Sequence, residues 1–109
     1  MENQTVTEGK TTAIIAYLYI PGIIIAFILN NSKKNSFASF HIRQALGLLL
    51  VLTMMNILEY YLGLGLVSWI VELGLLVLWV IAFIGVIKGE EKKVPFLGDQ
   101  FQDWFKNIG

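Results

Sequence analysis

The apolar positions of this chain fall in three long runs: a polar segment follows the first, and a short glycine-containing turn separates the second from the third. The runs cover residues 12–29, 45–62 and 66–87. A helix needs roughly 20 mainly apolar residues to cross the ~30 Å hydrocarbon core of a bilayer. The pattern therefore predicts three transmembrane helices. Pro21 has no N–H to donate to the carbonyl of Tyr17, so we expect a kink in the first of them.

Two flanking segments are amphipathic rather than uniformly apolar. Residues 37–44 mix apolar and polar positions, and Ser36 is placed to cap a helix there. This predicts an interfacial start to the second helix. Residues 99–108 repeat apolar side chains at i, i+3, i+4 and i+7, which predicts a short helix on the membrane surface. Those side chains are Phe101, Trp104, Phe105 and Ile108.

Composition supports a membrane protein of one domain. The chain has 109 residues, of which 56% are hydrophobic and only 15% charged. A soluble domain of this size could not bury so much apolar surface. We predict an all-α integral membrane protein with three transmembrane helices and a C-terminal amphipathic interfacial helix.

The distribution of lysine and arginine predicts the orientation. With three spans, the N-terminus and the second loop share one side, which carries Lys10 alone. The first loop and the tail share the other side, which the positive-inside rule assigns to the cytoplasm. We therefore expect a multi-pass membrane protein with its N-terminus outside and its C-terminus in the cytoplasm. The cytoplasmic set is Lys33, Lys34, Arg43, Lys88, Lys92, Lys93 and Lys106.

The sequence offers little catalytic chemistry. It has no cysteine, one histidine and a formal net charge of zero. Disulfides and thiolate metal sites are excluded, and no overall charge attracts nucleic acid. His41 has no recognisable nucleophile partner, and no glycine-rich phosphate loop is present. We expect a protein that is not an enzyme and has neither a cofactor nor a metal site.

Polar residues within the predicted spans are candidates for function, because ionisable groups in lipid are costly. Glu59 and Glu72 flank the turn at residues 63–65 at similar distances, and Asn56 and Thr53 continue a polar stripe below Glu59. They could line an ion path, pack against a partner or a second copy, or be carboxylates with shallow access to water.

A second candidate set would contact a partner protein or lipid at the cytoplasmic face. His41, Arg43 and Gln44 lie where the second helix enters the membrane, and they could meet anionic headgroups or an acidic partner. The aromatic residues Phe101 and Trp104, with Phe105, would anchor the tail helix on the membrane or recruit a partner.

Two segments carry a family resemblance. Residues 37–48 read FASFHIRQALGL, and residues 88–106 contain KGE, VPFLGD and WFK. Together they resemble small bacterial membrane proteins labelled import-component-like, which are similar to the small membrane subunit of the chloroplast TIC translocon. The resemblance covers residues 12–108 and implies the bacterial inner membrane as the location and a link to protein translocation.

Two functions follow as expectations. The first is a non-enzymatic accessory or structural subunit of an inner-membrane complex, with lipid and a membrane-protein partner or a second copy as its contacts. The alternative is a small self-assembling channel or transporter that uses Glu59, Asn56 and Glu72.

Overall fold

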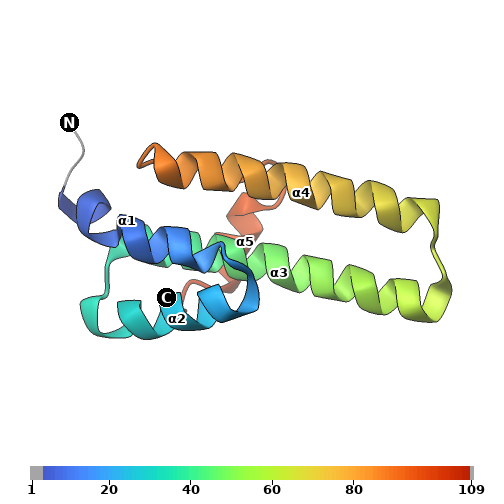
Figure 1. Cartoon of the computed structure of the whole chain (residues 1–109), viewed down its shortest axis with the longest axis horizontal. Coiled ribbons are helices and arrows are strands. Elements are labelled where there is room, and N and C mark those ends of the chain that lie inside the picture. Colours follow the sequence, from blue (N-terminus) through green and yellow to red (C-terminus); the bar gives the residue numbers. More distant parts are fainter. Residues whose placement is uncertain (1–3, 109) are drawn as a thin grey trace.

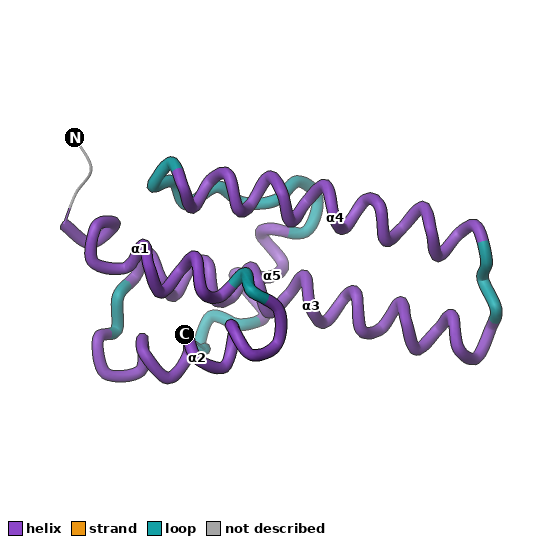
Figure 2. Tube along the Cα trace, viewed as in Figure 1, coloured by secondary structure: helices purple, strands orange, loops and turns teal. Residues whose placement is uncertain are grey.

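The computed structural model describes residues 4–108, and every regular element in that range is a helix (Figures 1 and 2). This confirms the all-α prediction. The helices are α1 (Gln4–Ala16), α2 (Tyr19–Lys33), α3 (Ser36–Leu62), α4 (Leu66–Ile87) and α5 (Gly98–Trp104).

The longest helices, α3 and α4, form an antiparallel pair joined by a tight turn (Figure 1). Gly63 and Gly65 take positive φ angles of 59° and 60°, a conformation that favours glycine. The Gly63 N–H closes α3 on the carbonyl of Glu59. By length and composition, both helices could cross a membrane. α3 runs unbroken through the predicted interfacial start and the predicted second span.

The first of the three predicted spans is not confirmed, because residues 12–29 do not form one helix. α1 ends at Ala16, and Tyr19 takes a φ of 65° before α2 begins. Pro21 lies four residues after Tyr17 and cannot continue α1, but it fits the first turn of α2. The expected kink is therefore a chain reversal.

Two contacts allow this reversal. The Tyr17 carbonyl, which Pro21 leaves without an intrahelical donor, accepts a hydrogen bond from the Trp79 indole at 3.1 Å. A Cβ on Gly22 would collide with the backbone carbonyl of Ile15, so glycine lets the start of α2 pass close to the end of α1.

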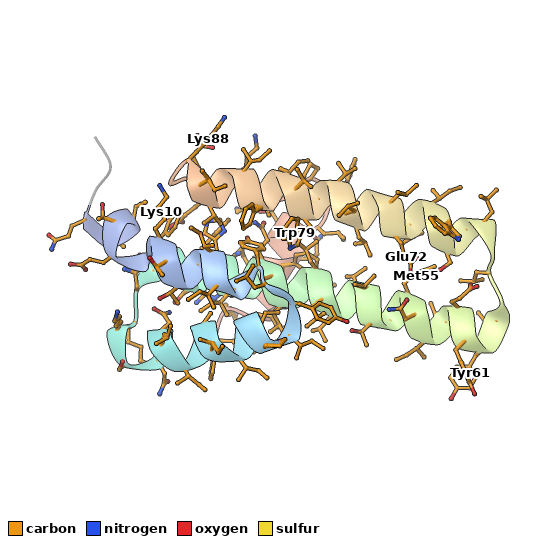
Figure 3. All side chains as sticks on the ribbon, viewed as in Figure 1. Lys10, Met55, Tyr61, Glu72, Trp79 and Lys88 are labelled. Carbon is orange, nitrogen blue, oxygen red and sulfur yellow. The ribbon has the colours of Figure 1, made fainter. Side chains whose placement is uncertain are left out.

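The reversal brings the start of α1 to the same end of the molecule as the α2–α3 loop (Figure 1). The Asn35 amide donates to the carbonyl of Thr5 at 2.8 Å across this junction. Lys10 and Lys88 also lie toward this end (Figure 3). The predicted N-terminus-outside orientation required a continuous first span, and this arrangement does not support it.

The core is confined to one half of the molecule. α1, α2 and α5 pack around the first half of α3, where Phe37, Ile42 and Phe101 are fully buried. The half nearest Gly63–Gly65 is the α3–α4 pair alone (Figure 1). The helix in the tail is shorter than predicted, since α5 ends at Trp104 rather than at residue 108.

Gly47 sets how closely α5 docks on α3, because a Cβ there would collide with the ring of Phe101. We expect Gly47→Ala to weaken docking by about 1–3 kcal/mol, since overpacking a filled core forces its neighbours apart. Limited proteolysis in detergent should then cut the tail faster. Gly74→Ala, on α4 with open space around it, is the matched control. Equal cleavage of the two variants would show that Gly47 does not control docking.

Candidate functional site

Three buried side chains form the centre of the packed half. The Tyr17 hydroxyl lies 2.7 Å from His41 Nδ1, and the Gln44 amide donates to the same hydroxyl at 3.0 Å. Tyr17 closes α1, and the other two residues lie one turn apart on α3. These residues, which we call the polar triad, join the reversing hairpin to the first membrane-spanning candidate.

The segment after α4 completes the triad through its backbone. His41 Nε2 lies 2.9 Å from the carbonyl of Glu90. Gln44 donates to the carbonyl of Lys92 at 3.1 Å and accepts from the N–H of Val94 at 2.9 Å. The chain that leaves α4 is therefore folded back and held against α3.

The fixed donors and acceptors determine where each proton lies. The Glu90 carbonyl can only accept, so His41 carries its proton on Nε2. Because Tyr17 accepts from the Gln44 amide, its own hydroxyl proton points to His41 Nδ1. Neutral His41 satisfies this arrangement, and no described buried side-chain nitrogen or oxygen lacks a partner.

Aromatic rings enclose the triad. The ring of His41 meets the rings of Phe37, Phe40 and Tyr17 edge-on, with centroids 4.7, 5.0 and 5.5 Å away. Tyr17 is itself buried, and its ring meets the rings of Trp79 and Phe83 edge-on. The triad is therefore shielded by aromatic side chains of α3 and α4.

A second polar cluster fixes the corner between α2 and α3. Asn30, which is buried, donates to the Ser39 hydroxyl at 2.9 Å and accepts from the N–H of Asn35 at 2.9 Å. The Asn35 side chain caps α3 by accepting from the N–H of Ala38. Asn35, rather than the predicted Ser36, is thus the N-cap.

The tail is bonded to α3 by two side chains. Arg43 donates to the carbonyls of Ile108 and Lys106 at 2.8 and 2.9 Å. Gln102 donates to the carbonyl of Phe40 at 2.9 Å. Arg43 therefore binds its own C-terminal segment.

The predicted contact surface is largely internal. The structure places His41, Gln44 and Phe101 in the interior of the chain, where all three are fully buried. The cause is the return of the chain after α4, which covers them. Of the three aromatic residues predicted for this contact, Trp104 is 64% exposed and Phe105 is half-buried, so these two reach the surface.

The four polar residues predicted within the spans do not form one seam. Thr53 bonds to the carbonyl of Leu49 in its own helix, and Asn56 is exposed. The Glu59 carboxylate accepts from the Gly65 N–H at 3.1 Å, so it stabilises the turn. Glu72 lines the wall of a cavity, and among the described residues no hydrogen bond joins it to the other three.

That cavity has a volume of about 540 Å³ and lies where the α1–α2 reversal meets α3 and α4. Its wall is mostly apolar and includes Tyr19, Leu49 and Trp79. The volume is within the range of small-molecule sites. The described residues contain no group of three or more metal-ligating side chains.

Sequence reasoning missed Tyr17, Trp79 and the Asn30–Ser39 pair. Tyrosine and tryptophan are usually found at the membrane interface. The positions of Tyr17 and Trp79 inside apolar runs could therefore have indicated that both side chains have partners within the fold. Asn30 looked like part of a solvated loop, because the reversal of α1 onto α2 was not foreseen.

Gln44→Leu tests the polar triad. The change leaves the Val94 N–H, the Lys92 carbonyl and the Tyr17 hydroxyl without their Gln44 partner, and each buried unpaired group costs about 1–3 kcal/mol. We expect a large drop in thermal stability in detergent. Thr53→Val removes a hydroxyl bonded only within its helix, and it should change stability by no more than about 0.5 kcal/mol. Equal melting temperatures would contradict a structural role for the triad.

Comparison with known proteins gives the family. Residues 8–101 match the model of the magnetosome magnetite crystal formation protein family, MamF/MmsF. No curated protein and no solved structure matches the chain.

This match corrects the import-component-like resemblance, which was wrong, and removes the support for a role in translocation. The motifs that suggested it, at residues 37–48 and 88–106, are the segments that build the triad and the docked tail. The match spans most of the 109 residues, and the chain belongs to the MamF/MmsF magnetosome magnetite crystal formation protein family.

Proposed function

We propose that this protein is a non-enzymatic accessory component of the magnetosome membrane that supports magnetite crystal formation by organising other membrane components. The observation that carries the proposal is the family match over residues 8–101. The structure adds a physical reason to favour organisation over catalysis, since its buried polar groups are occupied in holding the fold.

The use of the buried polar residues supports this proposal. Tyr17, His41 and Gln44 bond to one another and to the backbone after α4. Breaking those bonds to bind a substrate would leave buried groups unpaired. Such a centre suits a protein that serves as a rigid platform for other membrane components.

The outer surface also supports it, because it consists of apolar helix faces. On α2, Ile24 and Ile28 are 55% and 65% exposed. On α4, Leu73 and Val77 are more than half exposed. Faces of this kind pack against lipid or against the helices of other membrane proteins.

We propose a topology with two spans, α3 and α4, and a hairpin of α1 and α2 that enters and leaves on one side. No lysine or arginine occurs between residues 45 and 87, so the Gly63–Gly65 end carries none. The positive-inside rule then puts both termini in the cytoplasm. Non-helical backbone at membrane depth is tolerated where protein covers it, as Trp79 covers the Tyr17 carbonyl.

Single cysteines can test this topology, since the natural chain has none. Gln4→Cys and Ser32→Cys should react with an impermeant maleimide from the same side of the membrane. Tyr61→Cys, beside the α3–α4 turn and 76% exposed, should react from the opposite side. A three-span protein would instead label Gln4→Cys together with Tyr61→Cys.

Removal of the gene from a magnetite-forming cell tests the function. We expect fewer or smaller crystals by electron microscopy, and restoration by the wild-type gene. The double variant Ile24→Ala/Ile28→Ala keeps α2 apolar but changes its shape, so it should insert normally yet restore crystals poorly if α2 packs against a protein.

The double variant Leu73→Ala/Val77→Ala on α4 is the control, since it truncates two exposed apolar side chains at the same i, i+4 spacing on another helix. Normal crystals after gene removal would contradict the proposed function. Full restoration by the double variant would exclude the α2 face as the contact.

A further inference from the structure

We propose that the cavity beneath the α1–α2 hairpin holds one acyl chain of a bilayer phospholipid, from the leaflet on the Gly63–Gly65 side. The inference rests on α3 and α4 crossing the membrane, which is part of the proposed topology. It does not depend on the role in crystal formation.

The first argument is the difference in length between the hairpin and the spans. At 1.5 Å per residue, the 27 residues of α3 measure about 40 Å, whereas the 15 residues of α2, which ends beside the start of α3, measure about 22 Å. The hairpin enters from the basic end and therefore stops about 18 Å short of the end of α3 at the Gly63–Gly65 turn. The cavity of about 540 Å³ lies at this step, between the hairpin tip and the α3–α4 pair.

The second argument is the chemistry of the wall. Tyr19, Ala45, Leu49 and Leu76 contribute to a lining that is mainly apolar. A volume of this size would accommodate many water molecules, but water there would find few hydrogen-bond partners. Lipid hydrocarbon surrounds the protein at this depth, and it can contact an apolar wall without losing any hydrogen bonds.

The third argument is the placement of the one carboxylate in the cavity wall. Glu72, Leu76 and Trp79 follow one another along α4 on the cavity side. Figure 3 places Glu72 nearer the Gly63–Gly65 turn and Trp79 nearer the hairpin. The polar end of the cavity therefore faces the nearer membrane surface, as the glycerol end of a lipid in that leaflet would, and the apolar end faces the bilayer centre.

Trp79 provides the readout, because it lines the deep end of the cavity. In the double variant Trp69→Phe/Trp104→Phe it is the sole tryptophan. The full chain would be reconstituted in vesicles whose phosphatidylcholine carries bromine near the end of one acyl chain. We expect these lipids to quench Trp79 although its side chain packs between helices.

Filling the cavity should abolish this quenching. Ala45→Leu and Leu49→Phe, each added to the sole-Trp79 protein, place bulk where the chain would lie. Gly74→Leu adds similar bulk to α4 in open space and should leave the quenching unchanged. Circular dichroism identifies a filling variant that fails to fold. In that case the quenching of Trp79 in the other filling variant tests the proposal.

Three results would overturn the proposal. The first is no quenching of Trp79 by lipid brominated near the chain end, although Trp69 in a companion Trp79→Phe/Trp104→Phe protein is quenched by lipid brominated near the headgroup. The second is equal quenching with and without the filling substitutions. The third is no quenching of Trp69 either, which would show that α4 does not cross the bilayer, and that outcome would overturn the topology as well.

Discussion

The backbone carbonyl of Tyr17 is the point on which the arrangement of this protein depends. Pro21 deprives it of the donor that a continuous helix would supply, and the chain reverses there instead of continuing as one helix. In an apolar environment an unpaired carbonyl costs several kcal/mol, so a partner must come from elsewhere in the fold. The Trp79 indole on α4 provides it.

Tyr17 also belongs to the polar triad, so the residue whose carbonyl Trp79 satisfies contributes its side chain to the buried centre. Its hydroxyl oxygen accepts a hydrogen bond from the Gln44 amide and its hydroxyl proton points to His41, so one tyrosine ties α1 to both α3 and α4. Because Gln44 and His41 also hold the backbone after α4, the hairpin and the returning tail are stabilised together. Removing one member of the triad would leave hydrogen-bonding groups of the other members unpaired. We therefore expect the hairpin, the first half of α3 and the returning tail to unfold cooperatively.

The sequence was sufficient for the features that depend on local pattern. Apolar runs predicted the helices over 45–62 and 66–87, and the glycines at 63 and 65 predicted the turn between them. The local sequence pattern could not predict the reversal at Tyr17, because a proline within an apolar run is compatible with either a kinked helix or a break between two helices. The choice depends on whether a distant donor such as Trp79 meets the freed carbonyl. The burial of His41 and Gln44 was likewise set by a long-range return of the chain, which no local periodicity records.

The account is tested most directly by the distance between the start of α1 and the end of α2 in a lipid bilayer. Spin labels on Gln4→Cys and Ser32→Cys, measured by pulsed electron resonance in vesicles, report it. The account predicts a short distance, with both labels at one membrane surface, because the Asn35 amide bonds to the Thr5 carbonyl at that junction. A distance of about 30 Å or more, the thickness of the hydrocarbon core, would contradict the reversal and restore a continuous first span.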